Sequence, residues 1–179
     1  MLGCTAGLAA LAVAAAVLFV VDRGRDEGAP ADARRQAEVA ERGREVMPFD
    51  LERTTHRFTP TADGGHQTVT ADEPVERRQV ALVRKHLRAE AERFRRGDFT
   101  DPARIHGTEM PGLAELRAGA GRIGIEYSEL PAGARLDYRT TEPELLRALH
   151  AWFDAQVADH GPHAEHGLPS GPDGGQVSG

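Results

Sequence analysis

The chain has almost no cysteine: of its 179 residues only Cys4 is one, and it lies inside an apolar N-terminal segment. The rest of the chain therefore forms no disulfide and offers no thiolate for zinc binding or nucleophilic catalysis. The formal net charge of −6 argues against a nucleic-acid-binding surface. The sequence also lacks a Walker loop, a Gly-x-Ser-x-Gly elbow and a His-Glu-x-x-His motif, so an enzyme is our third choice of function class.

Charge is absent from the first twenty-one residues, which are mostly Ala, Leu, Val and Phe. As a helix this segment would measure about 25–30 Å, enough to cross a bilayer core. We predict that residues 1–21 are a transmembrane anchor, with an uncleaved signal as the alternative. Arg23 and Arg25 favour a cytoplasmic C-terminal part, but an apolar segment before one small domain is typical of export. We therefore expect a membrane-anchored domain outside the cytoplasm.

The hydrophobic periodicity predicts an α+β domain over residues 47–161, after a tether and short helix over residues 22–46. Two strand–strand–helix units are expected. Their strands lie at 55–61, 66–71, 123–128 and 136–138, and their helices at about 75–96 and 141–159. We predict a four-stranded antiparallel sheet with the two long helices on one face. We predict that residues 98–121 form a connector with two short helical turns. Residues 162–179 are predicted to be a disordered tail rich in His, Gly and Pro.

All eight histidines lie between His56 and His166. His86 and His150 fall within the predicted long helices, each four residues before a carboxylate, Glu90 and Asp154, at a spacing that lets side chains touch. His150 and His160 are about 15 Å apart along one helix, so the two do not bind the same ion.

Two further histidines are candidates from their local context. His106 lies in an irregular stretch beside Glu109, and loops often carry function. His56 alternates with Phe58 on one strand face, and an inward position would make it a candidate ligand. The closing His160-x2-His-x2-His166 tract is also able to bind divalent metals loosely.

The leading hypothesis is binding of a transition metal, Zn or Cu, or of haem, by histidines. Our first-choice ligands are His56, His106 and His150, followed by His86 and His160. Behind them we expect carboxylates that orient the imidazoles: Glu90, Glu109 and Asp154. A shared ion requires three of these imidazoles within about 5 Å of one point. The alternative is a non-catalytic interaction or pH-responsive module with structural histidines. The membrane is the only partner predicted.

Residues 49–166 resemble a family of small bacterial proteins of unassigned function that are exported or membrane-anchored. The resemblance rests on phrases such as Thr-His-Arg-Phe at 55–58, Gly-Asp-Phe at 97–99 with Ile-His-Gly at 105–107, Met-Pro-Gly-Leu at 110–113, and Leu-His-Ala-Trp-Phe-Asp-Ala-Gln at 149–156 with Asp-His-Gly at 159–161. Some members carry the label aspartate carbamoyltransferase. That enzyme is longer and uses a Ser-x-Arg-Thr loop, whereas the nearest string here, Tyr-Arg-Thr-Thr at 138–141, lacks the serine. We do not transfer the activity.

Overall fold

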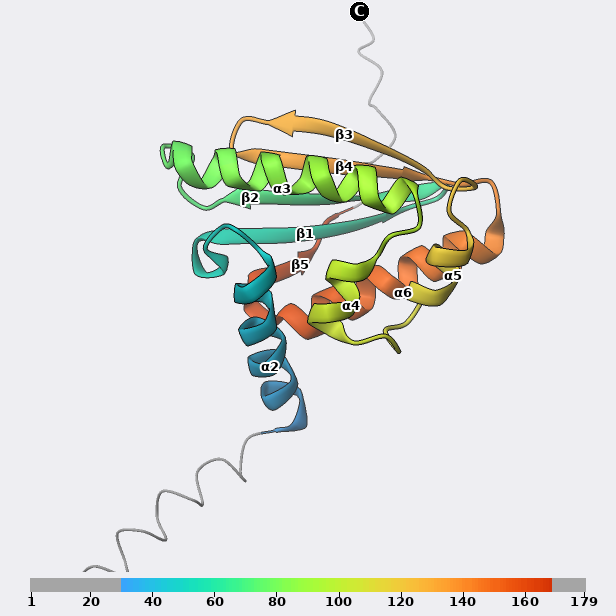
Figure 1. Cartoon of the computed structure of the whole chain (residues 1–179), viewed down its shortest axis with the longest axis horizontal. Helices are drawn as coiled ribbons and strands as arrows, with labels where there is room; N and C mark the ends of the chain where they lie inside the picture. The colour runs from blue at the N-terminus through green and yellow to red at the C-terminus, as the bar shows by residue number, and fades with distance from the viewer. Residues whose placement is uncertain (1–29, 169–179) are drawn as a thin grey trace, which may run out of the picture. The chain divides into compact units, whose positions relative to one another are not determined.

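The computed structural model describes residues 30–168, and those from Arg35 onward belong to one compact unit. Residues 30–34, which include the start of helix α2, belong to a separate N-terminal unit. The elements in chain order are α2 (Ala31–Val46), η1 (Leu51–Arg53), β1 (Thr54–Thr61), β2 (Gly64–Ala71), α3 (Arg77–Arg95), α4 (Thr100–His106), α5 (Leu113–Ala118), β3 (Gly124–Leu130), β4 (Gly133–Arg139), α6 (Pro143–His160), η2 (Gly161–His163) and β5 (Ala164–His166) (Figure 1).

The sheet has five strands in the order β3-β4-β2-β1-β5. The two predicted hairpins form and join through β2 and β4, so these four strands are antiparallel. The prediction of a four-stranded antiparallel sheet is wrong in one respect, because β5 pairs in parallel with β1 and makes the sheet mixed. β5 comes from residues that the composition assigned to a disordered tail. Its short pairing, beginning at His56 opposite Ala164, covers part of the outer edge of β1.

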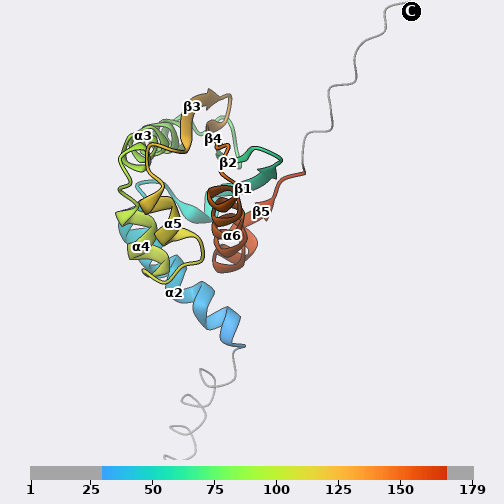
Figure 2. The ribbon, with the colours of Figure 1, turned by 90° about the vertical axis from the view of Figure 1, so that its right-hand side faces the viewer.

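The two longest helices, α3 and α6, cover the same face of the sheet (Figure 2). α3 packs on β2, β3 and β4, and α6 packs on β1, β2 and β5. On the covered face, Phe58 of β1 lies opposite Gln67 of β2, and Gln67 lies opposite Leu136 of β4. The residues one step along each strand, such as Arg57 and Arg135, point to the other face, which is polar, because successive side chains alternate across a strand.

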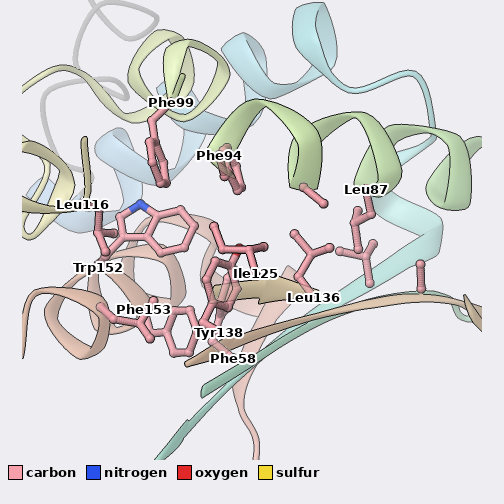
Figure 3. Packing of buried hydrophobic residues seen from close by; sticks show 14 of the residues in the cluster. Phe58, Leu87, Phe94, Phe99, Leu116, Ile125, Leu136, Tyr138, Trp152 and Phe153 are labelled. Atoms are coloured by element: carbon pink, nitrogen blue, oxygen red, sulfur yellow. The ribbon is translucent and has the colours of Figure 1, made fainter. Parts of the chain in front are cut away.

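The core lies between α3, α6 and the covered face of the sheet, with Trp152 at its centre (Figure 3). Phe94 and Phe99 stack on each other at 4.4 Å between ring centroids, and both rings lie nearly perpendicular to the indole of Trp152. Phe58 and Tyr138 reach Trp152 from the sheet side. This aromatic packing holds α4, which follows Phe99, against the end of α6 that carries the site described below.

The connector between the two hairpin–helix units contains the two short helical stretches that were predicted, but the first extends to His106 and changes its setting. His106 is the last residue of α4, not part of an irregular stretch, and Gly107, with φ of 90°, ends the helix. Gly112, with φ of 76°, begins α5 where its backbone lies directly against α6.

The predicted anchor at 1–21 and most of the tether lie outside the described residues, as do residues 169–179. Within residues 30–168, no helix is both long and apolar enough to cross a bilayer.

Candidate functional site

A small cavity opens between β1, α3, α4 and α6, with a volume of about 40 Å³. That volume accommodates about three water molecules or a single ion with a small ligand. Polar side chains line it to an unusual degree for a protein interior, four of them histidines: His56, Gln67, His86, Glu90, Asp101, His106, Gln156 and His160. The apolar part of its wall includes Met47, Phe58 and Trp152.

Three buried histidines lie side by side at one end of this cavity, and we call His56, His106 and His160 the imidazole cluster. Their exposed fractions are 3%, 3% and 8%. The rings of His56 and His106 each lie 5.0 Å, centroid to centroid, from the ring of His160. Each comes from a different element: His56 from the inward face of β1, and the other two from the last residues of α4 and α6.

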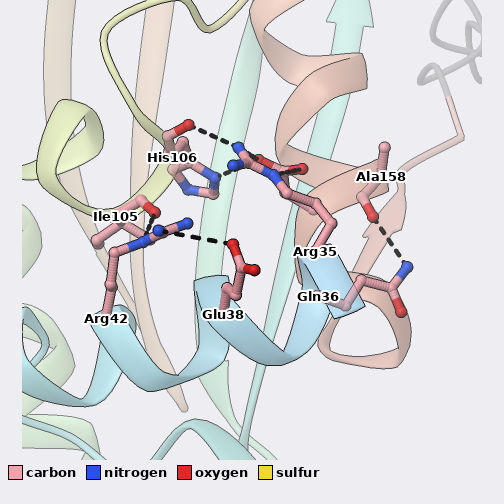
Figure 4. A network of polar contacts seen from close by, with 8 residues as sticks. Arg35, Gln36, Glu38, Arg42, Ile105, His106 and Ala158 are labelled. Carbon is pink, nitrogen blue, oxygen red and sulfur yellow. Dashed lines mark hydrogen bonds and ion pairs between the residues drawn. The ribbon is translucent and has the colours of Figure 1, made fainter. Parts of the chain in front are cut away.

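Asp159 fixes the orientation of one member of the cluster. Its Oδ2 lies 2.8 Å from Nδ1 of His106, and the same carboxylate receives two hydrogen bonds from the guanidinium of Arg35 (Figure 4). Burial opposes ionisation of this carboxyl, yet the hydrogen bonds from His106 and Arg35 lower the pKa of Asp159 below its usual value. A carboxylate on Nδ1 places the proton there and leaves Nε2 with a free lone pair.

The other two members of the cluster are held in the neutral form. Burial, assisted by the neighbouring His86, lowers the pKa of His56 to about 3. Burial, assisted by His56, lowers the pKa of His160 well below its ordinary value. In addition, Nδ1 of His56 is buried without a hydrogen-bond partner. Neutral imidazole with a free ring nitrogen is the form that binds a metal ion.

Two carboxyl groups, Glu90 and Asp101, also line the cavity. Arg93 pairs with Glu90, at 3.0 Å, and with Asp101, so the two carboxyls lie close together. Burial and the charge of Asp101 raise the pKa of Glu90 to about 8, so Glu90 is mainly protonated at neutral pH. His86 is a further lining residue: its ring contacts Phe49, which also contacts His56, and burial lowers its pKa to about 4.

The structure brings together four of the five histidines proposed from the sequence. His150 lies elsewhere, since its Nε2 hydrogen-bonds to the carbonyl oxygen of Gly64 at 2.8 Å. Of the proposed carboxylates, Glu90 lines the cavity, whereas Glu109 and Asp154 are exposed. The carboxylate that does orient an imidazole, Asp159, was missed. Its partner is fifty-three residues away in the chain, so no helical spacing pointed to it.

The rings of the imidazole cluster lie close together but are not aimed at one point. The rings of His56 and His106 each lie 5.0 Å, centroid to centroid, from the ring of His160. The rings of His56 and His160, however, are nearly parallel, at 9°, and the lone pairs of stacked imidazoles do not converge. Across residues 30–168, no three His, Cys, Asp or Glu side chains already surround a common metal position. A shared ion therefore requires a side-chain rotation of His56 or His160.

The fold and the cavity together define an α+β domain with a buried histidine cluster. Comparison of the chain with protein-family models, with curated proteins and with solved structures gave no match. The family resemblance drawn from the sequence remains a prediction, and the function is inferred from the site alone.

Proposed function

We propose that this domain binds one transition-metal ion through the imidazole cluster. The observation that carries the proposal is the burial of three adjacent imidazoles with a carboxylate behind one of them. Burying three polar rings costs free energy unless they gain partners, and Nδ1 of His56 has none. An ion that accepts their lone pairs supplies that partner.

The dimensions of the cluster favour an ion over haem. For metal–nitrogen bonds near 2.0–2.1 Å and tetrahedral geometry, two imidazoles on one ion place their centroids about 5 Å apart. A cofactor of haem size needs a pocket of roughly 300 Å³ or more, whereas this cavity measures about 40 Å³. Nitrogen ligands without a thiolate suit Zn²⁺ or Cu²⁺. We therefore narrow the hypothesis to one such ion.

The proposal also includes where the domain acts. The uncharged segment at residues 1–21 supports a domain held at a membrane, and an apolar segment before one small domain favours a position outside the cytoplasm. In that setting the domain would bind, store or pass on an extracytoplasmic metal ion.

A second candidate function is pH sensing without a metal. It is favoured by the lowered pKa values of His56, His86 and His160, since buried neutral histidines become charged only when the surrounding structure opens. In that case acidification would expose the cavity to a partner.

Metal analysis of the full chain, purified in mild detergent without a tag, tests the proposal. We expect about one equivalent of Zn²⁺ or Cu²⁺ by elemental analysis, and a visible spectrum typical of nitrogen ligands after Co²⁺ substitution. His106→Ala and His160→Ala should each abolish tight binding. His150→Ala, which removes an imidazole from the same helix as His160, should retain it.

Two results would decide against the metal ion. One is a chain that takes up neither Zn²⁺ nor Cu²⁺ at micromolar free metal. The other is uptake that His106→Ala leaves unchanged. Absence of metal together with reversible exposure of the cavity below pH 6, measured by binding of a hydrophobic dye, would support the pH-responsive module instead.

A further inference from the structure

The helix that precedes the cavity wall in the chain is attached to the histidine site by an unusual set of contacts. We propose that residues 35–46 of α2 form a removable strap that controls access to the imidazole cluster. The proposal extends the suggested function to control of access. It rests on contacts seen in the structure and does not depend on a bound ion.

The strap contacts the rest of the domain mainly through polar groups (Figure 4). Nε of Arg42 donates to the carbonyl oxygen of Ile105 at 2.6 Å, and Arg35 donates to the carbonyl oxygen of His106 at 2.6 Å. These carbonyls lie at the C-terminal end of α4, where they lack partners within the helix. Arg35 also holds Asp159, and Gln36 donates to the carbonyl oxygen of Ala158 at 3.0 Å. The two guanidinium groups thus tie down the helix ends that carry His106 and His160.

Apolar contacts of the strap are few by comparison. Val39 and Gly43 are its buried residues, whereas α3 buries six residues, most of them large and apolar. Hydrogen bonds at a solvent-exposed helix are exchanged for hydrogen bonds to water when the helix leaves, while buried apolar surface has no such replacement. The strap is therefore expected to detach at a lower free energy than unfolding of the α3–α6 core requires.

Detachment of the strap would open the cavity. Met47 follows α2 directly and lines the cavity, and Phe49 contacts both His56 and His86. A displacement of α2 that carries Met47 along removes part of the wall next to the imidazole cluster. In the sequence the strap lies between the apolar N-terminal segment and the residues of the site.

Chemical modification of the histidines tests the strap without any metal. The full chain in mild detergent is treated with diethylpyrocarbonate, and the modification rate of each histidine is followed by mass spectrometry. In the double variant Arg35→Ala/Arg42→Ala we expect His106 and His160 to react at least ten times faster than in the unmodified chain. His150, which lies outside the cavity, should react at the same rate. The control Arg44→Ala removes an exposed arginine of the same helix that pairs with Glu41 and Glu52, and should change neither rate.

Hydrogen exchange of the unmodified chain provides a second measurement that needs no variant. Amides of residues 36–46 should exchange at least ten times faster than those at the centre of α6, without matching loss of protection in β1. The proposal is overturned if these amides are as protected as those of α6. It is also overturned if a natively folded double variant keeps the slow rates at His106 and His160. If the double variant does not fold, the exchange rates of the unmodified chain decide. If the unmodified chain binds no metal but His106 and His160 are modified faster in the double variant, the metal proposal is wrong and the strap proposal is retained.

Discussion

At the scale of single residues, Asp159 connects three parts of the site. It accepts hydrogen bonds from His106 and Arg35, and it directly precedes His160 in the chain. Its carboxylate thus orients one imidazole, holds the strap and lies at the end of the helix that presents another imidazole. A charge-assisted hydrogen bond contributes about 1.5–3 kcal/mol, and the partial exposure of Arg35 reduces that value here.

We expect Asp159→Asn to lower the free energy of unfolding by about 1–2 kcal/mol at pH 7. The amide keeps an oxygen acceptor for Nδ1 of His106 but loses the charge that binds Arg35. Urea denaturation followed by circular dichroism measures the change. Asp154→Asn on the same helix is the matched control, because Asp154 is exposed and should shift stability by less than about 0.5 kcal/mol. Equal effects of the two substitutions would contradict the role given to Asp159.

At the scale of elements, the site depends on how closely α5 approaches α6. A Cβ atom on Gly112 would lie 2.0 Å from the backbone oxygen of Ala148, so α5 begins in direct backbone contact with α6. Gly112 also has φ of 76°, which other residues adopt only with strain. The connector that carries His106 therefore stays folded against α6 because this position has no side chain.

A pair of glycine substitutions separates close packing from backbone strain. Gly121 has φ of 83°, similar to that of Gly112, but a Cβ atom on Gly121 would meet no other atom within 4 Å. Gly121→Ala should therefore cost about 1–2 kcal/mol for the left-handed conformation alone. Gly112→Ala should cost at least about 3 kcal/mol, because the helices must move apart. Denaturation curves of both variants test this, and similar losses would mean that the contact between α5 and α6 is loose.

At the scale of the whole molecule, the ionisable groups of the cavity make folding stability depend on pH. The histidines and Glu90 act in opposite directions. His56, His86 and His160 have lowered pKa values in the folded state, so they bind protons mainly in the unfolded chain as pH falls below about 6.5. Glu90 has a raised pKa of about 8, so the folded state keeps its proton while the unfolded chain loses it above about pH 4.5. Acid and base each disfavour folding, but through different residues.

We predict a stability maximum near pH 7. Between about pH 4.5 and 6.5 the three histidines outweigh Glu90, leaving a net difference of about two protons, so stability rises with pH by roughly 2–3 kcal/mol per unit. From about pH 7 to 8.5 Glu90 outweighs the residual protonation of the unfolded histidines by about half a proton at most, so stability falls by less than about 1 kcal/mol per unit. Urea denaturation across this range measures the profile.

A matched pair of substitutions on α3 assigns the alkaline part of that profile. Glu90→Gln, which mimics the protonated acid, should remove the decline above pH 7, whereas Glu92→Gln at an exposed position should keep it. Stability that does not fall between pH 7 and 8.5 in the unmodified chain would show that Glu90 is already ionised.

Much of the fold could be predicted from local pattern. The alternation in both hairpins and the period of the two long helices placed these elements within a few residues of their observed bounds. The polar face and the buried face of β1 also followed from alternation, which put His56 inside with Phe58. The fifth strand could not be predicted, because Ala164–His166 forms only by pairing with β1 and has no strand pattern of its own.

The sequence by itself determined the α+β class, the two hairpin–helix units and the supply of imidazoles without thiolates, because these depend on composition and on side-chain period. Only the tertiary structure decided which histidines meet. His160 joins His56 and His106, while His150 on the same helix turns to Gly64, because the packing of α6 directs its two ends to different surroundings. The pairing of Asp159 with His106 likewise needs α4 to lie against the end of α6. Contacts between distant segments arise from packing, and no local spacing encodes them.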